Sequence, residues 1–309
     1  MKISVAMATY NGADYVEEQL ESIRTQTMAV DEVRICDDRS KDQTVDVVRQ
    51  YIQKYNLEAT WTIEVNPENL GYASNFMKAV KQTDGDYIFF CDQDDIWIKD
   101  RVERMVGLME QYPDMLLLGS EFDAFVSSED APSVPSWEQK MIKHDESIEK
   151  MQFTPANIFI GCQGCTMCMR RELLDQAMPY WYEGWAHDEF VWKLALCMNG
   201  LYMYHSYTLK RRLHSNNVTM HKVRDAKKRL KYLTDLLASH EATLKYAKEN
   251  GLDSDKLRLL EKNIKATNLR IELIRNKKLG NSIPLALFYH ECYHKCRAIP
   301  VELMMAIKN

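Results

Sequence analysis

The amino-acid sequence predicts an α/β fold with a mainly parallel central sheet, followed by an α-helical extension at the carboxyl end. β-rich apolar segments alternate with helical segments at short spacing through the first half of the chain, a pattern typical of parallel α/β sheets. From residue 221 onward the period becomes that of long helices, with leucines at 230, 233, 236 and 237. We therefore expect one folded unit over residues 1–220 and a helical extension over 221–309.

The individual elements follow from local patterns. Strands are expected over residues 3–8, 33–36, 61–65 and 87–91, each a β-rich apolar run that ends in a polar turn. Capping-box spacings predict helices that begin at Asp14 and Ser40, and further helices are expected after Gly71 and over residues 188–199. A loop over 121–149 is expected to lead into a helix near 137–150. In the extension, Gly251 predicts a helix stop, with helices over 254–278 and 283–308 on its far side.

Charge is distributed unevenly along the chain. The 309 residues contain 40 basic and 45 acidic side chains, a net charge of −5. Residues 1–220 carry 21 basic and 35 acidic side chains, a net of −14, whereas residues 221–309 carry 19 and 10, a net of +9. The acidic front part argues against nucleic acid as a partner. Eight scattered cysteines, an amino terminus without a signal-peptide core and the lack of an apolar run of about 18 residues lead us to expect a cytoplasmic protein.

Acidic clusters follow two of the expected strands, where open α/β sheets bind ligands. Asp92 and Asp94 lie in an Asp-Gln-Asp-Asp run after one strand, and their oxygen donors suit Mg²⁺ or Mn²⁺ shared with phosphates. A solvated acidic loop is the alternative explanation. Asp37 and Asp38 follow another strand, where a carboxylate could accept the N–H of a pyrimidine base or simply form a turn. No glycine-rich dinucleotide loop or P-loop follows the first strand, which argues against nicotinamide oxidoreductases and P-loop kinases.

Seven short segments occur in one order along residues 1–220. They are residues 5–12 (VAMATYNG), 37–44 (DDRSKDQT), 69–71 (NLG), 91–97 (CDQDDIW), 164–167 (GCTM), 187–188 (HD) and 212–218 (RLHSNNV). In this combination the sequence resembles glycosyltransferase family 2, and within it the bacterial rhamnosyltransferase-like branch that builds surface polysaccharides. The resemblance implies a GT-A fold, a nucleotide-diphosphate sugar donor and transfer with inversion at the anomeric carbon.

The resemblance also implies roles for individual residues. Tyr10 matches the residue that stacks on the base and Asp38 the acid that hydrogen-bonds it, with Ala8, Asn11 and Asn75 as further donor-site residues. Asp92 and Asp94 match the metal-binding DxD motif, with Asp94 on the metal and Asp92 also on the sugar or ribose side. His214 is expected to complete the metal shell or contact the pyrophosphate, and Arg212 to pair with a phosphate. Mn²⁺ or Mg²⁺ is the implied cofactor.

Asp188 matches the family's catalytic base, but the sequence departs from the family pattern around it. Glu189 follows where aromatic residues are usual, so Glu189 is a rival base, and Asp188 could instead only cap a helix. Arg39 replaces the glycine of the usual Asp-Asp-Gly-Ser turn beside the nucleotide site.

The expected activity is metal-dependent transfer of a sugar to a hydroxyl of a surface polysaccharide or lipid-linked glycan. The donor is expected to be dTDP-rhamnose, and a UDP-hexose would suit the same residues. A sugar nucleotidyltransferase and an inactive glycan-binding module are the alternatives.

Two groups of cysteine and histidine residues, and the basic extension, can each be interpreted in two ways. Cys162, Cys165 and Cys168 have a spacing that could hold an iron–sulfur cluster, and a second set of residues could bind zinc, namely His290, Cys292, His294 and Cys296. Packing within the protein is the alternative for both groups. The basic extension over 221–309 is expected to dock on the acidic body and form a homodimer, or to contact anionic lipids at the inner face of the membrane.

Overall fold

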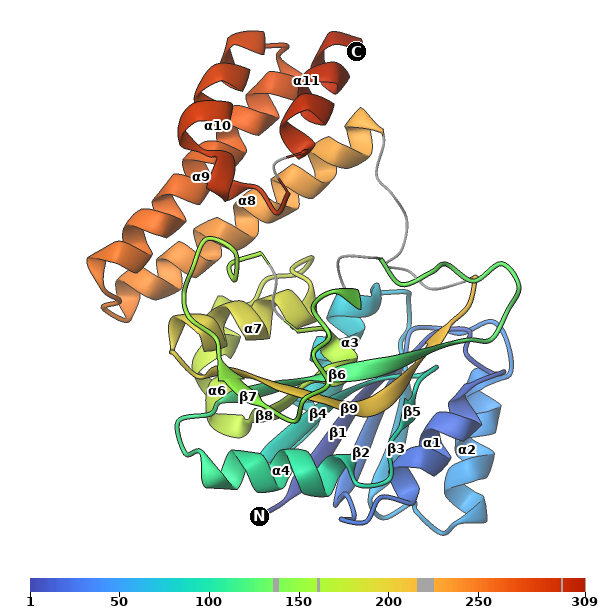
Figure 1. Ribbon diagram of the computed structural model, residues 1–309. Helices are drawn as coiled ribbons and strands as arrows, with labels where there is room; N and C mark the ends of the chain where they lie inside the picture. Colours follow the sequence, from blue (N-terminus) through green and yellow to red (C-terminus); the bar gives the residue numbers. More distant parts are fainter. Residues whose placement is uncertain (136–138, 160–161, 216–224, 296, 309) are drawn as a thin grey trace.

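The structure, a computed structural model, describes residues 1–135, 139–159, 162–215, 225–295 and 297–308. Within these residues a nine-stranded mixed sheet has the order β3-β2-β1-β4-β8-β6-β9-β5, with β7 paired to β9 (Figure 1). The strands are β1 (Ile3–Thr9), β2 (Glu32–Asp37), β3 (Trp61–Val65), β4 (Tyr87–Asp92), β5 (Ile96–Trp97), β6 (Leu117–Val126), β7 (Ile148–Lys150), β8 (Cys168–Arg170) and β9 (Leu201–Leu213).

The first four strands are parallel, as predicted. β1 pairs with β2 and β4, and β2 pairs with β3, all in parallel. The register places Thr9 beside Asp37 and Ala8 beside Asp92. Because parallel strands end at the same edge of a sheet, the polar turns after β1, β2 and β4 meet there.

The other half of the sheet brings a distant segment to the same edge. β9 runs parallel to β6, whereas β8 is antiparallel to both β4 and β6. β5 is antiparallel to β9, with Ile96 opposite Lys210 and Trp97 opposite Leu209. This pairing fixes the end of β9, and therefore His214 after it, beside the 92–95 turn.

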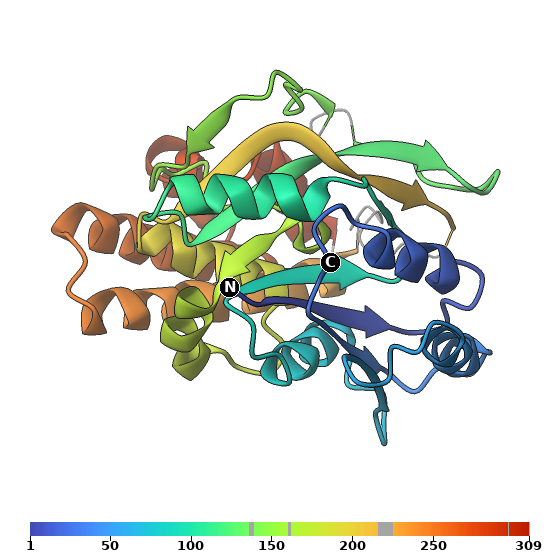
Figure 2. The same cartoon turned by 90° about the horizontal axis from the view of Figure 1, so that it is seen from below.

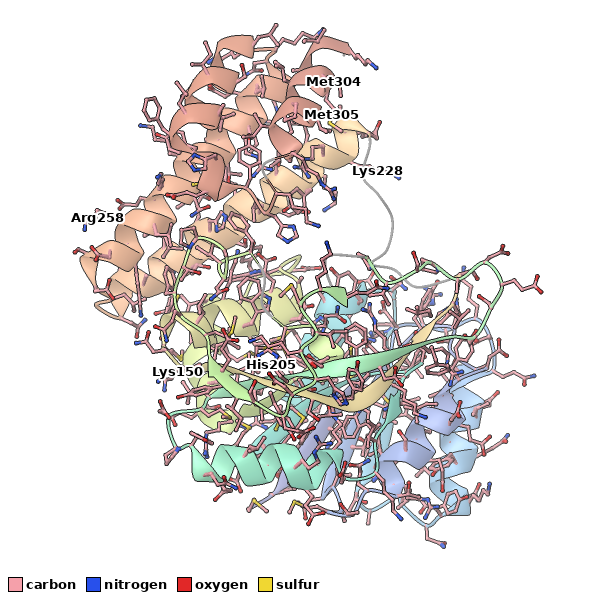
Figure 3. All side chains as sticks on the ribbon, in the orientation of Figure 1. Lys150, His205, Lys228, Arg258, Met304 and Met305 are labelled. Carbon is pink, nitrogen blue, oxygen red and sulfur yellow. The ribbon has the colours of Figure 1, made fainter. Side chains whose placement is uncertain are left out.

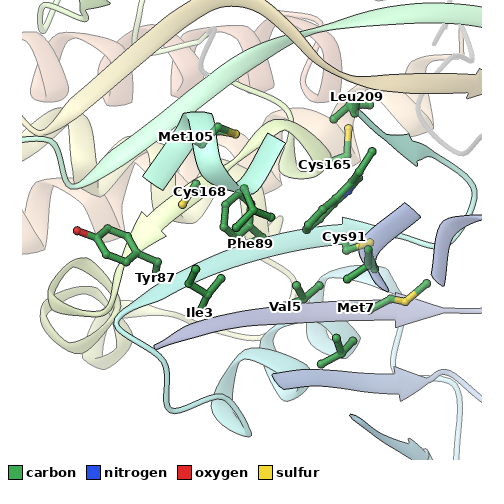
Figure 4. Packing of buried hydrophobic residues seen from close by; sticks show 14 of the residues in the cluster. Ile3, Val5, Met7, Tyr87, Phe89, Cys91, Met105, Cys165, Cys168 and Leu209 are labelled. Atoms are coloured by element: carbon green, nitrogen blue, oxygen red, sulfur yellow. The ribbon is translucent and has the colours of Figure 1, made fainter. Parts of the chain in front are cut away.

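Helices cover both faces of the sheet (Figure 2). The helices α1 (Val16–Arg24), α2 (Thr44–Lys54) and α4 (Arg101–Gln111) pack on one face, and α3 (Tyr72–Lys81), α6 (Arg171–Ala177) and α7 (His187–Cys197) on the other. Side chains alternate along each strand, so Val5 and Met7 join the first core (Figure 4) while Ala6 joins the second. The 3₁₀ turns are η1 (Gly164–Thr166), η2 (Met178–Tyr180), η4 (Leu279–Asn281) and η5 (His290–Cys292).

The predicted capping boxes are wrong. α1 begins at Val16 and α2 at Thr44, and neither helix has a side-chain cap from its N-cap residue. Ser40 is used elsewhere: its hydroxyl donates to Asp37 and accepts from the backbone N–H of Asn11. The residue therefore ties two loops together, a tertiary role that local spacing cannot reveal.

The helix predicted near 137–150 is wrong over residues 140–150, because Gln139 is helical but residues 148–150 form β7 on the edge of β9. Residues 136–138, which include Trp137, lie outside the described residues. Just before β7, the backbone N–H groups of Lys143 and His144 donate to the buried carboxylate of Glu121. The backbone polar groups of this segment thus form hydrogen bonds with β9 and with the Glu121 carboxylate. In a helix they would have been paired within the segment itself.

The carboxyl-terminal extension consists of helices that stand on the α7 side of the sheet (Figure 1). They are α8 (Ala226–Glu249), α9 (Ser254–Arg275), α10 (Ser282–Phe288) and α11 (Ala298–Lys308). Gly251, with φ of 65°, follows α8 and confirms the predicted helix stop. The predicted 220/221 boundary falls between β9 and α8, in the segment 216–224 outside the described residues. None of the helices in the described part of the chain is long and apolar enough to span a membrane.

A buried ion cluster holds the extension together. Glu302 of α11 is 0% exposed, and its Oε1 lies 2.8 Å from Arg270 Nη2 and 2.6 Å from Arg229 Nη2. The Tyr293 hydroxyl donates to its Oε2 at 3.2 Å. Burial alone would raise the pKa of Glu302, but hydrogen bonds and charge from the two arginines outweigh it and hold the pKa below 4.5. One carboxylate thus links α8, α9 and α11.

We predict that Glu302→Gln lowers the free energy of unfolding by about 3–5 kcal/mol, because two buried guanidinium groups lose their counter-charge. Since the folded-state pKa is depressed, this contribution is present above the unfolded-state pKa and is lost as pH falls through the folded-state pKa. The difference between variant and wild type, measured by urea unfolding, should therefore shrink below about pH 4.5.

The matched control for this prediction is Glu261→Ala, which removes an exposed ion pair from α9 to Lys248 of α8. It should affect stability far less. Equal losses in the two variants would contradict the role given to Glu302.

Candidate active site

A cavity of about 1010 Å³ opens at the carboxyl ends of β1, β2 and β4. Its walls also include the start of α3, the turn η1, the start of α7 and the residues after β9. Most of the predicted site residues line it, namely Ala8, Tyr10, Asn11, Asp38, Asn75, Asp92, Asp94, Asp188 and His214. Arg212 and Glu189 are not among its lining residues. One cavity therefore collects residues from nearly the whole of residues 1–220.

Asp38 organises the loop that begins α3. Its carboxylate accepts hydrogen bonds from the backbone N–H groups of Leu70 (2.7 Å) and Gly71 (2.9 Å) and from Asn66 Nδ2 (3.0 Å). Asn75 completes this wall, because its Nδ2 donates to the carbonyl of Cys36 and its Oδ1 accepts from Asn66. Gly71 lies at φ of 80°, which only glycine adopts readily. Asp38 and Asn75 therefore shape one end of the cavity through internal hydrogen bonds.

The Tyr10 ring projects from a loop whose backbone is held firmly. The side-chain amide of Gln93 accepts from the Tyr10 N–H and donates to the Tyr10 carbonyl. A Cβ at Gly12 would lie 2.2 Å from Gln93 Cδ, so a larger residue there would push the Gln93 amide out of this position. Tyr10 is 43% exposed, which leaves its face open to a planar ligand. Arg39, which replaces the usual glycine, adopts a left-handed φ of 64° in the neighbouring turn.

Three carboxyl groups crowd the turn after β4. Burial, followed by the charge of Asp94, raises the pKa of Asp92 to about 7, and the same two causes raise the pKa of the buried Asp95 well above its ordinary value. Asp94 Oδ2 lies 2.7 Å from His214 Nε2. Like charges in a confined site favour either protonation or the binding of a cation.

The donor set fits a hard divalent cation. Asp94 and His214 place an oxygen and a nitrogen as close as two neighbouring ligands of one ion, and Asp92 adds a second carboxylate from the same turn. Asp92, Asp95 and Cys165 also present potential ligand atoms within 4.8 Å of one another. Burial raises the pKa of the Cys165 thiol well above 9, and a protonated thiol is a poor ligand for Mg²⁺ or Mn²⁺.

Asp188 and Glu189 have different environments at the start of α7. Asp188 lines the cavity, and its Oδ1 accepts from the backbone N–H of Glu189 at 2.7 Å. Glu189 Oε1 instead lies 2.5 Å from Lys193 Nζ and 3.0 Å from Ser239 Oγ of α8. Lys193 is buried, and its Nζ also donates to Ser239. The carboxylate of Glu189 therefore joins α7 to the helical extension.

Arg212 is engaged away from the cavity. Its Nε donates to the Asp94 carbonyl at 2.9 Å, its Nη2 pairs with Glu18, and its backbone N–H donates to Asp95. Arg211 lines the cavity instead, because neighbouring residues of a strand face opposite sides. The sequence shows two neighbouring arginines, Arg211 and Arg212. Which of them faces the cavity can be decided only from the register of β9.

His187 also lines the cavity, but the sequence did not identify it as a site residue. It is buried, it stacks on Phe76 with ring centroids 3.9 Å apart, and burial lowers its pKa to about 4. A Cβ at Gly164 would lie 2.5 Å from its Nε2. A neutral imidazole at this point fixes the start of α7 and therefore the place of Asp188.

Within the described residues, neither the group of three cysteines nor the group of histidines and cysteines comes together as a metal site. Cys162, Cys165 and Cys168 are buried free thiols, and the described residues contain no metal-type grouping of all three. His290, Cys292 and His294 do not form such a group within the described chain either, and Cys296 lies outside it. Residues 216–218 of the last family-like motif also lie outside the described residues.

Comparison with known proteins gives the family. Residues 4–176, more than half of the chain, match the model of glycosyl transferase family 2. The chain belongs to glycosyltransferase family 2. This membership confirms the resemblance inferred from the seven segments and makes the protein a nucleotide-sugar transferase.

Two relatives are similar to the chain over more than half of its length. The dTDP-rhamnosyl transferase RfbG of Shigella flexneri is 29% identical over 222 residues, which cover 68% of this chain and 72% of RfbG. TuaG of Bacillus subtilis, a putative teichuronic acid biosynthesis glycosyltransferase, is 27% identical over 183 residues, 56% of this chain and 64% of TuaG. These likenesses support a place in polysaccharide biosynthesis.

Solved structures confirm the GT-A fold. Staphylococcus aureus TarS 1–349 in complex with UDP-GlcNAc has a TM-score of 0.66 at 16% identity, covering 100% of this chain and 91% of that one. The mannosyltransferase PcManGT of Pyrobaculum calidifontis, in complex with GDP-Man and Mn²⁺, has a TM-score of 0.57 at 17% identity, covering 99% and 86%. The similarity extends over the helical extension as well as the sheet.

We predict that Asp38→Ala lowers the free energy of unfolding by about 2–4 kcal/mol, because two backbone N–H groups and the Asn66 amide lose their acceptor. Urea unfolding of the variant measures the loss. Asp46→Ala, which removes an exposed carboxylate from α2, is the control and should change stability little. A similar, small effect in both variants would refute the organising role of Asp38.

Proposed function

We propose that the protein is a metal-dependent, inverting glycosyltransferase that moves rhamnose from dTDP-rhamnose to a hydroxyl of a surface polysaccharide or lipid-linked glycan. The observation that supports it best is that Asp92, Asp94, His214 and Asp188 line one cavity in a family 2 chain. The likeness to RfbG supports the choice of donor. In this proposal residues 1–220 form the catalytic unit and residues 221–309 a helical extension.

A UDP-hexose is the second candidate donor. TarS, which has the same fold, has been solved in complex with UDP-GlcNAc. The proposed nucleotide site would accept either base, because Tyr10 offers a stacking face and Asp38 a carboxylate at the same end of the cavity. Ala8, Asn11 and Asn75 form the remaining walls of this site. The family match favours sugar transfer over sugar-nucleotide synthesis.

The proposed metal ligands are Asp92, Asp94 and His214, holding Mn²⁺ or Mg²⁺. A bound divalent cation supplies Lewis-acid stabilisation of the diphosphate leaving group. Arg211, which lines the cavity, is the proposed cation beside the phosphates in place of Arg212. Arg212 supports this arrangement from outside by holding the Asp94 carbonyl and the Asp95 side chain.

Asp188 is the proposed catalytic base. It lines the same cavity as the acidic turn after β4, where a carboxylate can accept the proton of an acceptor hydroxyl. Direct displacement with one such base inverts the anomeric carbon. Glu189 is a poorer candidate for the base. Its carboxylate neutralises the ammonium group of the buried Lys193, and this ammonium group would be left unpaired if the carboxylate moved away.

We also propose where the enzyme acts and how it reaches its acceptor. Residues 221–309 are proposed to bring the enzyme to the inner face of the membrane or to a second copy of the chain, close to a lipid-linked acceptor. The surplus of positive charge in this segment, 19 basic against 10 acidic side chains, supports the membrane contact.

We predict that Asp188→Asn lowers kcat for sugar transfer by about a hundredfold to ten-thousandfold, because it removes the base but keeps the shape of the side chain. Donor affinity, measured by calorimetric titration, should stay near that of the wild type. Glu189→Gln is the matched comparison: it should lower the free energy of unfolding by about 2–3 kcal/mol and change kcat less than about tenfold. The reverse pattern would make Glu189 the base.

We also predict that Mn²⁺ raises the thermal unfolding midpoint of the wild type by roughly 5 °C or more at about 100 times its dissociation constant. Asp94→Ala should abolish this shift, whereas Asp130→Ala, at an exposed turn, should keep it. Repeating the scan with dTDP, UDP and GDP sugars identifies the base. A shift that persists in Asp94→Ala would place the metal elsewhere.

A further inference from the structure

The exposed face of α11 is apolar. Val301, Met304 and Ile307 are spaced three residues apart and point outward, and Met304 lies at the end of the extension farthest from the sheet (Figure 3). The only acidic residue of the helix, Glu302, is fully buried between two arginines. A helix on the surface of a globular protein normally shows the opposite pattern, with its charges outward.

The neighbouring helix α10 continues the apolar surface. Its sequence, SIPLALF, contains no charged residue, and it shares a buried cluster with α11 through Leu285 and Ala306. We define the α10–α11 surface by seven side chains that are each 41–65% exposed: Leu279, Ile283, Leu287, Phe288, Val301, Met304 and Ile307. They are 7 of the 15 large exposed apolar side chains in the described residues. Such a concentration marks a contact surface rather than scattered exposure.

The charge around this surface is mainly positive. Residues 272–308 contain six basic residues and three acidic ones, Glu272, Glu291 and Glu302. All three acidic side chains are paired, Glu272 with Lys278 at 3.2 Å, Glu291 with Lys262 at 2.5 Å and Glu302 with its arginines. Lys227 and Lys228 add exposed positive charge at the start of α8, which meets α11 through Arg229 and Glu302. The surface is thus apolar with a basic margin.

We propose that the α10–α11 surface docks on a lipid bilayer that carries anionic headgroups. The seven apolar side chains would lie at the boundary between headgroups and acyl chains, with the surrounding lysines on the headgroup phosphates. The proposal specifies the surface and the lipid class for the membrane contact included in the proposed function, but it does not depend on the donor, the metal or the base. A symmetric contact with a second copy is disfavoured, because it would bring two basic margins together.

The geometry connects this surface to the catalytic cavity. α8 runs from Arg229, which contacts α11, to Ser239, which contacts Glu189 beside Asp188. These two positions are ten residues apart on one helix, which corresponds to about 15 Å. A docked α10–α11 surface would therefore hold the start of α7 at a fixed height above the bilayer, within reach of an acceptor attached to lipid.

The test is co-sedimentation of the full chain with vesicles, without any nucleotide sugar. One set of vesicles is phosphatidylcholine alone, and the other contains about one third phosphatidylglycerol. We expect binding to the anionic vesicles, at least about tenfold weaker binding to phosphatidylcholine, and weakening by salt. Phe288→Glu combined with Ile307→Glu, one change in each helix, should reduce binding to the anionic vesicles by about tenfold or more.

Val126→Glu is the matched control, because Val126 is 66% exposed but lies on β6. It should bind vesicles as the wild type does. Circular dichroism verifies the fold of each variant, and a donor-hydrolysis assay, which reports on the cavity alone, separates failure of docking from failure of the proposed function. The proposal is overturned if the wild type ignores anionic vesicles, or if the double variant binds them equally well. It is also overturned if the wild type is a dimer that the double variant dissociates without any vesicle binding.

Discussion

The parallel register of β1 with β2 and β4 is the constraint on which the rest of the site depends. It sets Thr9 beside Asp37 and Ala8 beside Asp92, so three polar turns share one edge of the sheet. The Asp38 carboxylate then fixes the loop before α3, and the Gln93 amide fixes the loop that carries Tyr10. Each contact joins residues that are tens of positions apart in sequence. A shift of one residue in the register would turn these side chains to the other face.

Electrostatics distinguishes the acidic turn after β4 from the structural ion clusters of the protein. Burial, followed by the charge of Asp94, raises the pKa values of Asp92 and Asp95, which works against folding at neutral pH. Nearby positive charge from Arg211 offsets this only in part. Two other groups of buried charges are neutralised by ion pairs, namely Glu302 with two arginines and Lys193 with Glu189. The difference between these arrangements supports the proposed binding of a divalent cation at the turn.

The helical extension is integrated with the catalytic unit. Ser239 of α8 contacts both Glu189 and Lys193 of α7, and the next turns of α8 complete the core around α7. Glu189 follows the proposed base directly, so the packing of α8 helps to fix where that base lies. Only part of the positive charge of residues 221–309 therefore lies on the surface of the protein. Some of its cations, such as Arg229 and Arg270, are structural. Other cations near the α10–α11 surface are exposed, namely Lys227, Lys228, Lys277, Lys278 and Lys308.

The sequence by itself determined the α/β class, the strands β1 to β4 and the helical extension, because apolar periodicity and polar strand ends are local properties. Its resemblance to glycosyltransferase family 2 identified most residues of the cavity. It could not distinguish Arg211 from Arg212 or find His187, since those depend on which face of β9 and which wall of the cavity a side chain meets. Nor could it show that Ser40 links two loops or that residues 148–150 add a strand to β9. Tertiary structure decided these points, because each rests on partners that are close in space and distant along the chain.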